Sequence, residues 1–221
     1  MLKEGIALKK RSDSLQYRRV DKAILAAFVY LSGKMPFEKI TVQDILDEAL
    51  VSRYTFYAHF QDKYAVAERL QNDVYQEFLT FMKKTIPEID AKQVTREQHY
   101  QMIDSATMAF GQAYHAQVQA LKKIHTETVD FEKQIKEYFA SNYRHSCAAH
   151  PYVELEAEIY SSMAAAVMEY YSNRSVPGKV DNESVMRAYA NTAVYALGIH
   201  DPKQIEKTST YLLKIAHKNE Q

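Results

Sequence analysis

The chain has 221 residues, which is enough for one helical domain or two small ones with a hydrophobic core. It holds only five Gly and five Pro, and Ala, Leu, Glu, Lys, Gln and Met recur throughout, so we expect an all-α fold. The formal net charge is zero, and the total charge therefore indicates no class of partner. Residues 1–22 nevertheless hold seven Lys and Arg against three Asp and Glu, and this excess favours a local anionic partner.

The single cysteine, Cys147, excludes an internal disulfide and favours a reducing compartment. The first ten residues hold no apolar core of signal-peptide length. The apolar run at residues 23–31 is too short to span a membrane. We therefore expect a cytoplasmic protein with no membrane partner.

Two helices are predicted before residue 50. The first covers about residues 15–32, where apolar side chains recur at spacings of three and four. The second opens at Thr41 and runs to about Ala49, and Asp44 completes the pattern of a reciprocal capping box.

The stretch V-S-R-Y-T-F-Y-A-H-F-Q-D-K at residues 51–63 predicts a third helix of two turns, capped by Ser52. Val51, Phe56 and Phe60 lie roughly on one side and can anchor it to the core. The outward side chains belong to Arg53, Tyr54, Thr55, Tyr57 and His59. A helix this short is only marginally stable by itself. Its polar and aromatic outward face therefore indicates a functional role.

Two short helices joined by a tight turn form a helix-turn-helix pattern, whose second helix is presented to the major groove of DNA. Arg53 can pair bidentately with guanine, whereas Thr and Tyr can touch a thymine methyl or a phosphate. Lys63 begins the next helix and is expected to be free to meet a phosphate.

The same residues resemble the N-terminal signature of the tetracycline-repressor (TetR) family of transcriptional regulators. The matching elements are Thr41, Ile45, A-x-V-S at 49–52 and T-F-Y-x-H-F-x-x-K at 55–63. The resemblance covers about residues 17–70. It implies a DNA-binding transcriptional regulator, and we expect neither an enzymatic activity nor a cofactor.

Two positions depart from the family pattern. Leu50 stands where the family usually has Gly in the turn, and Tyr54 stands where a small residue is common. Tyr54 suggests an unusual base contact, so the operator sequence cannot be inferred from relatives.

Nine residues are predicted to contact DNA. They are Thr41, Gln43, Ser52, Arg53, Tyr54, Thr55, Tyr57, His59 and Lys63. The resemblance implies that Tyr57 touches the DNA backbone while its ring is half in the core. His59 either contacts the backbone as well or caps the end of its helix. The arm Lys9-Lys10-Arg11 is either a solvated tail or an extension that reaches DNA.

The resemblance implies a three-helix helix-turn-helix domain at residues 1–70, with a basic arm at about 1–14. A helical-bundle domain for ligand binding and dimerisation is expected at residues 71–221. A helical pattern at residues 63–86 joins the two domains, and further helical patterns cover residues 95–116, 117–125, 128–147, 152–173, 182–199 and 202–217.

In the family, the last long helices pair across a two-fold axis, and residues 152–173 and 182–199 suit that role. Apolar and small residues surround most of each helix, so each must be covered on more than one side. Candidate contact positions are Ala164, Ala165, Val194 and Leu197. The alternative is a pair of helices buried within one monomer.

Aromatic and Met residues suggest a pocket for a flat or greasy effector. Tyr75, Phe78 and Met82 share one face of the helix at 63–86, and residues from the following segments could face them. The predicted ligand-binding set is Tyr75, Phe78, Met82, Met102, Phe110 and Tyr114. The alternative is that these residues are ordinary core.

Neither a metal site nor a catalytic site is predicted. His145, Cys147 and His150 do not share one face of a helix, and a closed zinc site needs four ligands. No nucleophile-and-base arrangement supports an enzyme.

The function expected from these patterns is that of a homodimeric repressor on a palindromic double-stranded operator, released by a small-molecule effector. One alternative is the same fold controlled by a protein partner without a small ligand. The other is a helical enzyme that reuses the fold.

Overall fold

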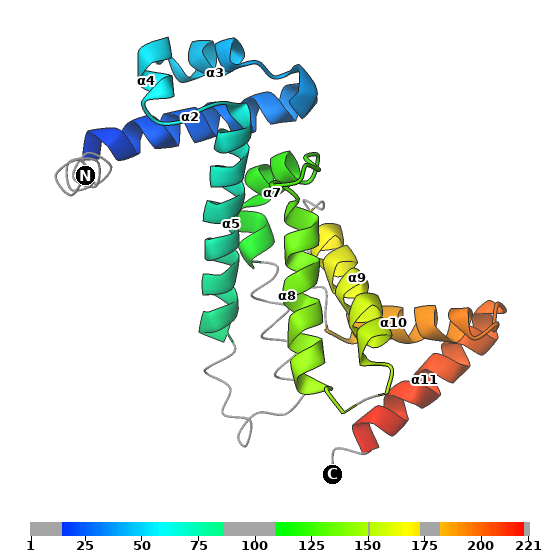
Figure 1. The fold of residues 1–221 in the computed structure, drawn as a ribbon. Coiled ribbons are helices and arrows are strands. Elements are labelled where there is room, and N and C mark those ends of the chain that lie inside the picture. The colour runs from blue at the N-terminus through cyan, green and yellow to red at the C-terminus, as the bar shows by residue number, and fades with distance from the viewer. Residues whose placement is uncertain (1–14, 86–108, 150, 173–181, 219–221) are drawn as a thin grey trace. The chain divides into compact units, whose positions relative to one another are not determined.

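The computed structural model of the chain describes residues 15–85, 109–149, 151–172 and 182–218. All regular secondary structure in these ranges is helical, which confirms the predicted all-α fold (Figure 1). The elements are α2 (Leu15–Lys34), the 3-10 turn η1 (Phe37–Lys39), α3 (Val42–Ala49), α4 (Arg53–Tyr57), α5 (Lys63–Thr85), α7 (His115–Leu121), α8 (Phe131–Ser146), α9 (Val153–Ser172), α10 (Asn182–Ala196) and α11 (Pro202–Lys218). The basic arm, the start of the helix expected at 95–116 and Met102 lie outside the described residues.

Contacts between residues divide the chain into two compact units. The first contains Met1–Thr80 and Phe110–Tyr138, and the second contains Phe81–Ala109 and Phe139–Gln221. These units group residues by packing, whereas the division at residue 70 concerns function and stays a prediction.

The core of the first unit is built from α2, α3, α4 and the start of α5. Ile24, Phe28, Ile45, Phe56 and Val66 are all fully buried there. Their spacing along each helix is the periodicity that predicted the helices, and α2 packs against both α3 and α7. This core fixes where the two short helices of the helix-turn-helix lie.

The start of α3 is held by the predicted capping box. The Thr41 hydroxyl oxygen accepts a hydrogen bond from the Asp44 backbone N–H at 3.2 Å, and the Asp44 carboxylate accepts one from the Thr41 N–H at 2.8 Å. The Thr41 hydroxyl also donates to this carboxylate, and its hydrogen bond is the main cause that lowers the pKa of Asp44. The capping box therefore favours the ionised form of Asp44.

The turn between α3 and α4 contains a residue in the left-handed conformation. Leu50 has φ 54° and ψ 42°, and its side chain is 92% exposed. Glycine adopts this region without the steric penalty that a Cβ atom brings. The departure from the family pattern at this position therefore has a local cost.

The second unit contains α9, α10 and α11, of which α10 and α11 pack against each other. Ala164, Ala165 and Val194 are buried within the chain itself, which conflicts with their predicted place at a contact with another chain. Leu197, the fourth predicted contact position, is 79% exposed. Among the described helices, none combines the length and the apolar content required to cross a membrane.

Candidate nucleic-acid interface

Helix α4 spans only Arg53–Tyr57 and ends before the predicted terminus at Phe60. The Ser52 hydroxyl oxygen caps it by accepting from the Thr55 N–H at 3.1 Å, as the sequence predicts. Phe56, fully buried, anchors the helix at its centre. The structure therefore fixes this helix by one cap and one deeply inserted ring.

The first turn of α4 faces solvent. Tyr54 is 78% exposed, Tyr57 is 51% exposed, and Arg53 is exposed as well. The outward face thus carries a guanidinium group and two phenol hydroxyls, which are suited to base edges and phosphates. Arg53, Tyr54 and Tyr57 therefore lie outward as the sequence predicts, whereas the prediction that His59 also faces outward is wrong, since its side chain is 6% exposed.

Arg53 is held by a residue of the preceding helix. Its guanidinium NH2 donates to the Gln43 side-chain oxygen at 2.9 Å, and the Gln43 amide nitrogen donates to the Asp47 carboxylate at 2.8 Å. Gln43 and Asp47 lie one turn apart on α3. The network therefore limits the rotamers of Arg53 while leaving its exposed end facing away from the core.

Lys63 lies in a different environment from the one expected. Its ammonium group donates to the backbone oxygens of Phe37, Glu38 and Ile40 at 2.8, 3.0 and 2.8 Å. The ammonium also lies 4.6 Å from the centroid of the Phe37 ring. Since an ammonium group has three N–H donors, all of them are used by η1 and the residue after it. A phosphate contact by Lys63 stays a prediction and would have to replace one of these bonds.

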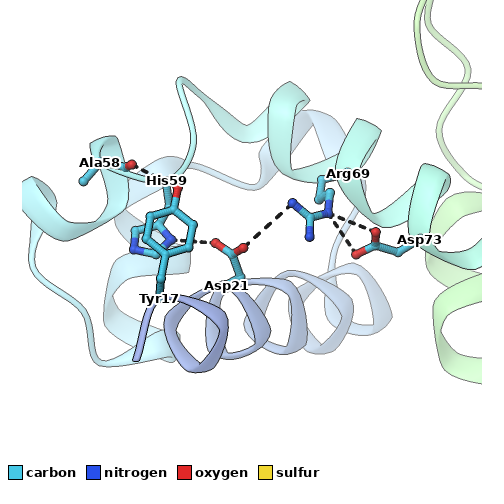
Figure 2. Close-up of polar contacts among 6 residues, drawn as sticks. All are labelled: Tyr17, Asp21, Ala58, His59, Arg69 and Asp73. Carbon is cyan, nitrogen blue, oxygen red and sulfur yellow. Dashed lines mark hydrogen bonds and ion pairs between the residues drawn. The ribbon is translucent and has the colours of Figure 1, made fainter. Parts of the chain in front are cut away.

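The His59 ring, directly after the C-cap of α4, is turned toward the protein (Figure 2). Its side chain is 6% exposed, and Nδ1 lies 2.5 Å from the Asp21 carboxylate on α2. The Tyr17 ring stacks on the imidazole at 3.8 Å between centroids. The predicted contact of His59 with the DNA backbone stays untested, and Nε2 is the ring nitrogen left for it.

The nine predicted DNA residues therefore fall into two sets. Arg53, Tyr54 and Tyr57 present exposed groups, with Gln43 bracing Arg53. The remaining members make internal hydrogen bonds: Thr41, Ser52, Thr55, His59 and Lys63.

The sequence reasoning missed Tyr17 and Asp21, which contact His59, and Arg69, which lies on the other side of Asp21 (Figure 2). Tyr17 and Asp21 are four residues apart on α2, so their spacing places them on one helix face. In the sequence, only this polar pair on the otherwise apolar face of the helix indicates that Tyr17 and Asp21 contact another polar group. It does not indicate which residue that group belongs to.

Four of the six predicted ligand residues come together in the first unit. The Phe78 ring packs edge-on against Phe110 at 5.5 Å and near-parallel to Tyr75 at 6.1 Å, while Phe110 stacks with Tyr114 at 5.2 Å. Burial is the main cause that raises the pKa of both Tyr75 and Tyr114. Both phenols are therefore held further from ionisation than a free tyrosine.

This aromatic cluster fits both readings that the sequence left open. Phe78 and Phe110 are each 1% exposed, which is typical of core residues, whereas Tyr75 and Tyr114 are partly exposed at its edge. Met82 is buried, and Met102 lies outside the described residues. Ligand binding here stays a prediction.

A groove of about 600 Å³ lies elsewhere, between α10 and α11. It is lined by Arg187, Asn191, Thr192, Tyr195, Pro202, Ile205 and Glu206. None of the predicted ligand residues lines it.

The described ranges contain no group of three or more His, Cys, Asp and Glu side chains that could hold a metal ion. Within them, the Cys147 side chain is hydrogen-bonded to Tyr143, whose pKa is raised to about 12, mainly by burial. His150 lies outside the described residues.

A comparison with known families supports the helix-turn-helix assignment. A family profile described as bacterial regulatory proteins of the tetR family matches residues 24–70. The matched segment begins inside α2, includes α3 and α4, and ends in α5. A search of curated proteins found no match to the chain. Residues 24–70 therefore form a helix-turn-helix domain of the kind found in bacterial regulatory proteins of the tetR family, and this domain supports a TetR-like DNA-binding transcriptional regulator.

Proposed function

We propose that the chain is a homodimeric repressor that binds a palindromic operator through α4 and is released by a small-molecule effector. The observation that best supports the DNA contact is Arg53 at the exposed start of α4, braced by Gln43 at 2.9 Å. A braced guanidinium is suited to bidentate recognition of guanine, because less side-chain freedom is lost on binding. Tyr54 and Tyr57 flank it with exposed phenols.

The proposed dimer is supported by apolar side chains left exposed on the second unit. On α9, Leu155 is 62% exposed and Ile159 is 53% exposed, and their spacing of four places them on one face. Leu197, directly after α10, and Tyr211, in α11, are also exposed. Large exposed apolar areas mark interaction surfaces, and reading two half-sites requires two copies of α4.

The proposed release acts through α5. Tyr75 and Phe78 lie on α5 in the aromatic cluster, and Lys63 at its start is bonded to η1. A ligand that binds one position of α5 better than another changes the population of DNA-competent dimers. The coupling free energy in such systems is typically about 1–3 kcal/mol.

The operator is tested by sequencing DNA fragments selected by the purified chain from a random pool. We expect an enriched motif with two-fold symmetry and half-sites about 10 base pairs apart. Binding should weaken steeply as the salt concentration rises. Absence of any enriched motif would exclude a sequence-specific repressor.

The dimer is tested by sedimentation of the double variant Leu155→Glu and Ile159→Glu. Two carboxylates on each α9 would face their copies across the proposed interface, so we expect monomers at low micromolar concentration. The control is Glu127→Lys, a charge change at an exposed position outside any described helix. A double variant that sediments like the wild type would exclude this face as the interface.

The effector is sought by screening small molecules for a rise in melting temperature and then for loss of operator binding. A hit that stabilises the chain and releases the DNA supports the proposal. A protein partner that releases DNA while no small molecule does so would favour the alternative mode of control.

A further inference from the structure

Helix α4 is too short to hold its own orientation. It has five residues, and a helix of that length is unstable without tertiary contacts. The buried Phe56 ring fixes its centre, and Ser52 caps its start. The direction in which its first turn points must therefore depend on what holds its other end.

That other end is held by two residues of α2. The Tyr17 hydroxyl donates to the backbone oxygen of Ala58, the C-cap residue of α4, at 3.3 Å. The Tyr17 ring lies over the His59 imidazole at an interplanar angle of 22°. The carboxylate of Asp21, one turn further along α2, is hydrogen-bonded to Nδ1 of the same imidazole. Figure 2 shows the Tyr17 ring over the His59 imidazole and the Asp21 carboxylate beside it.

Asp21 also faces α5. Its second carboxylate oxygen lies 3.8 Å from the guanidinium of Arg69, which in turn donates from Nε to both oxygens of Asp73 at 2.9 and 3.1 Å. The Asp21 side chain is only 10% exposed. A buried carboxylate is costly without partners, so the positions of His59 and Arg69 are coupled through it.

We propose that Asp21 is a positioning residue for DNA recognition, which orients α4 through His59 and makes that orientation depend on α5 through Arg69. The inference rests on the proposed contact of α4 with bases. It also assigns His59 an internal role in place of the predicted backbone contact. Asp21 is too buried to reach a phosphate, so any effect of Asp21 on DNA binding has to pass through its partners.

The test compares Asp21→Asn with the wild type on two DNA fragments, one selected by the wild-type chain and one scrambled. Asn keeps the shape of Asp but carries no charge and has a single acceptor oxygen, so it can accept a hydrogen bond from only one of His59 and Arg69. We expect about a ten-fold loss of affinity for the selected fragment. Affinity for the scrambled fragment should stay within two-fold, and the salt dependence should be unchanged, because no phosphate contact is lost.

Tyr17→Phe provides a second probe, because it keeps the stacked ring and removes the hydroxyl that bonds to Ala58. We expect about a three-fold loss on the selected fragment, again without a change on the scrambled one. The control is Asp73→Asn, which removes the exposed partner of Arg69 and should leave both affinities within two-fold. Circular dichroism and melting curves establish the temperature at which each variant is folded.

The outcomes separate this inference from the function on which it rests. If Arg53→Ala changes nothing on the selected fragment, then the proposed contact of α4 fails. If Arg53→Ala weakens that complex while folded Asp21→Asn binds like the wild type, or loses affinity equally on both fragments, then the positioning role is wrong. Should Asp21→Asn fail to fold, an unaltered Tyr17→Phe would also overturn it.

Discussion

The two ends of the segment at residues 51–63 both lie within the residues that match the family profile, yet they face different surroundings. At the start, Arg53 and Tyr54 present their side chains to solvent. At the end, His59 and Lys63 direct theirs to the chain's own carboxylate and carbonyl groups. A motif that marks DNA-binding domains therefore includes residues that build the domain as well as residues available to DNA.

The difference has a physical cause. A five-residue helix gains little from its own hydrogen bonds, so neighbouring elements must hold it. The end of the segment supplies attachments to α2 and η1, whereas Arg53 and Tyr54 at the start of α4 keep exposed side chains. We therefore expect substitutions at the end of the segment to lower the stability of the fold, and substitutions at its start to weaken DNA recognition.

The largest effect is expected from Phe56→Ala, since Phe56 is the fully buried anchor between the two ends. Removing a buried Phe typically costs about 3–5 kcal/mol of unfolding free energy. Chemical denaturation measures the loss. Tyr54→Ala, in the same helix but 78% exposed, is the control and should change stability by less than about 0.5 kcal/mol. Equal losses from both variants would mean that α4 is not anchored as described.

Lys63→Met probes the inward end. It removes the donor to three backbone oxygens and should lower the unfolding free energy by about 1–3 kcal/mol. Lys39→Met, at an exposed lysine of η1, is the control and should have little effect on stability.

The same variant decides between an internal role and a phosphate contact of Lys63. If Lys63 only holds η1, the salt dependence of DNA binding should not change in the folded variant. If it contacts a phosphate, the slope of log K against log salt should flatten by about one unit. A flattened salt slope together with an unchanged unfolding free energy would mean that Lys63 serves DNA binding and does not hold η1, contrary to the role given to this end of the segment.

Arg53→Ala probes the outward end. We expect a loss of about 1–3 kcal/mol in binding free energy on the selected fragment, with relaxed preference at one base pair per half-site. The unfolding free energy should change by less than about 0.5 kcal/mol, because Arg53 is exposed. Selection of DNA by the variant identifies the base pair. An unchanged motif would show that this helix does not read the sequence through Arg53.

The sequence predicts the helices and their caps because these depend on local chemistry. Thr41 and Ser52 cap α3 and α4 as expected, and apolar spacing identifies the buried rings. The partners of His59 and Lys63 were not predictable, because they lie 38 and 23 to 26 residues away in the chain. Spacing along a helix indicates its faces, but it does not identify the group that lies opposite each face.

The smallest expected effect concerns the turn that precedes α4. Leu50 is in the left-handed region, which costs an L-residue roughly 1–2 kcal/mol, and its 92% exposed side chain contributes little burial in return. Leu50→Gly removes this strain but increases the freedom of the unfolded chain, so we expect a net gain below about 1 kcal/mol. Leu50→Ala is the matched control, because it also removes the exposed side chain but keeps the Cβ atom and the strain. A melting curve that places the Gly variant above the Ala variant supports the strain at this turn. If the two variants have the same melting temperature, the left-handed conformation has no measurable free-energy cost, and the family's preference for Gly must have another origin.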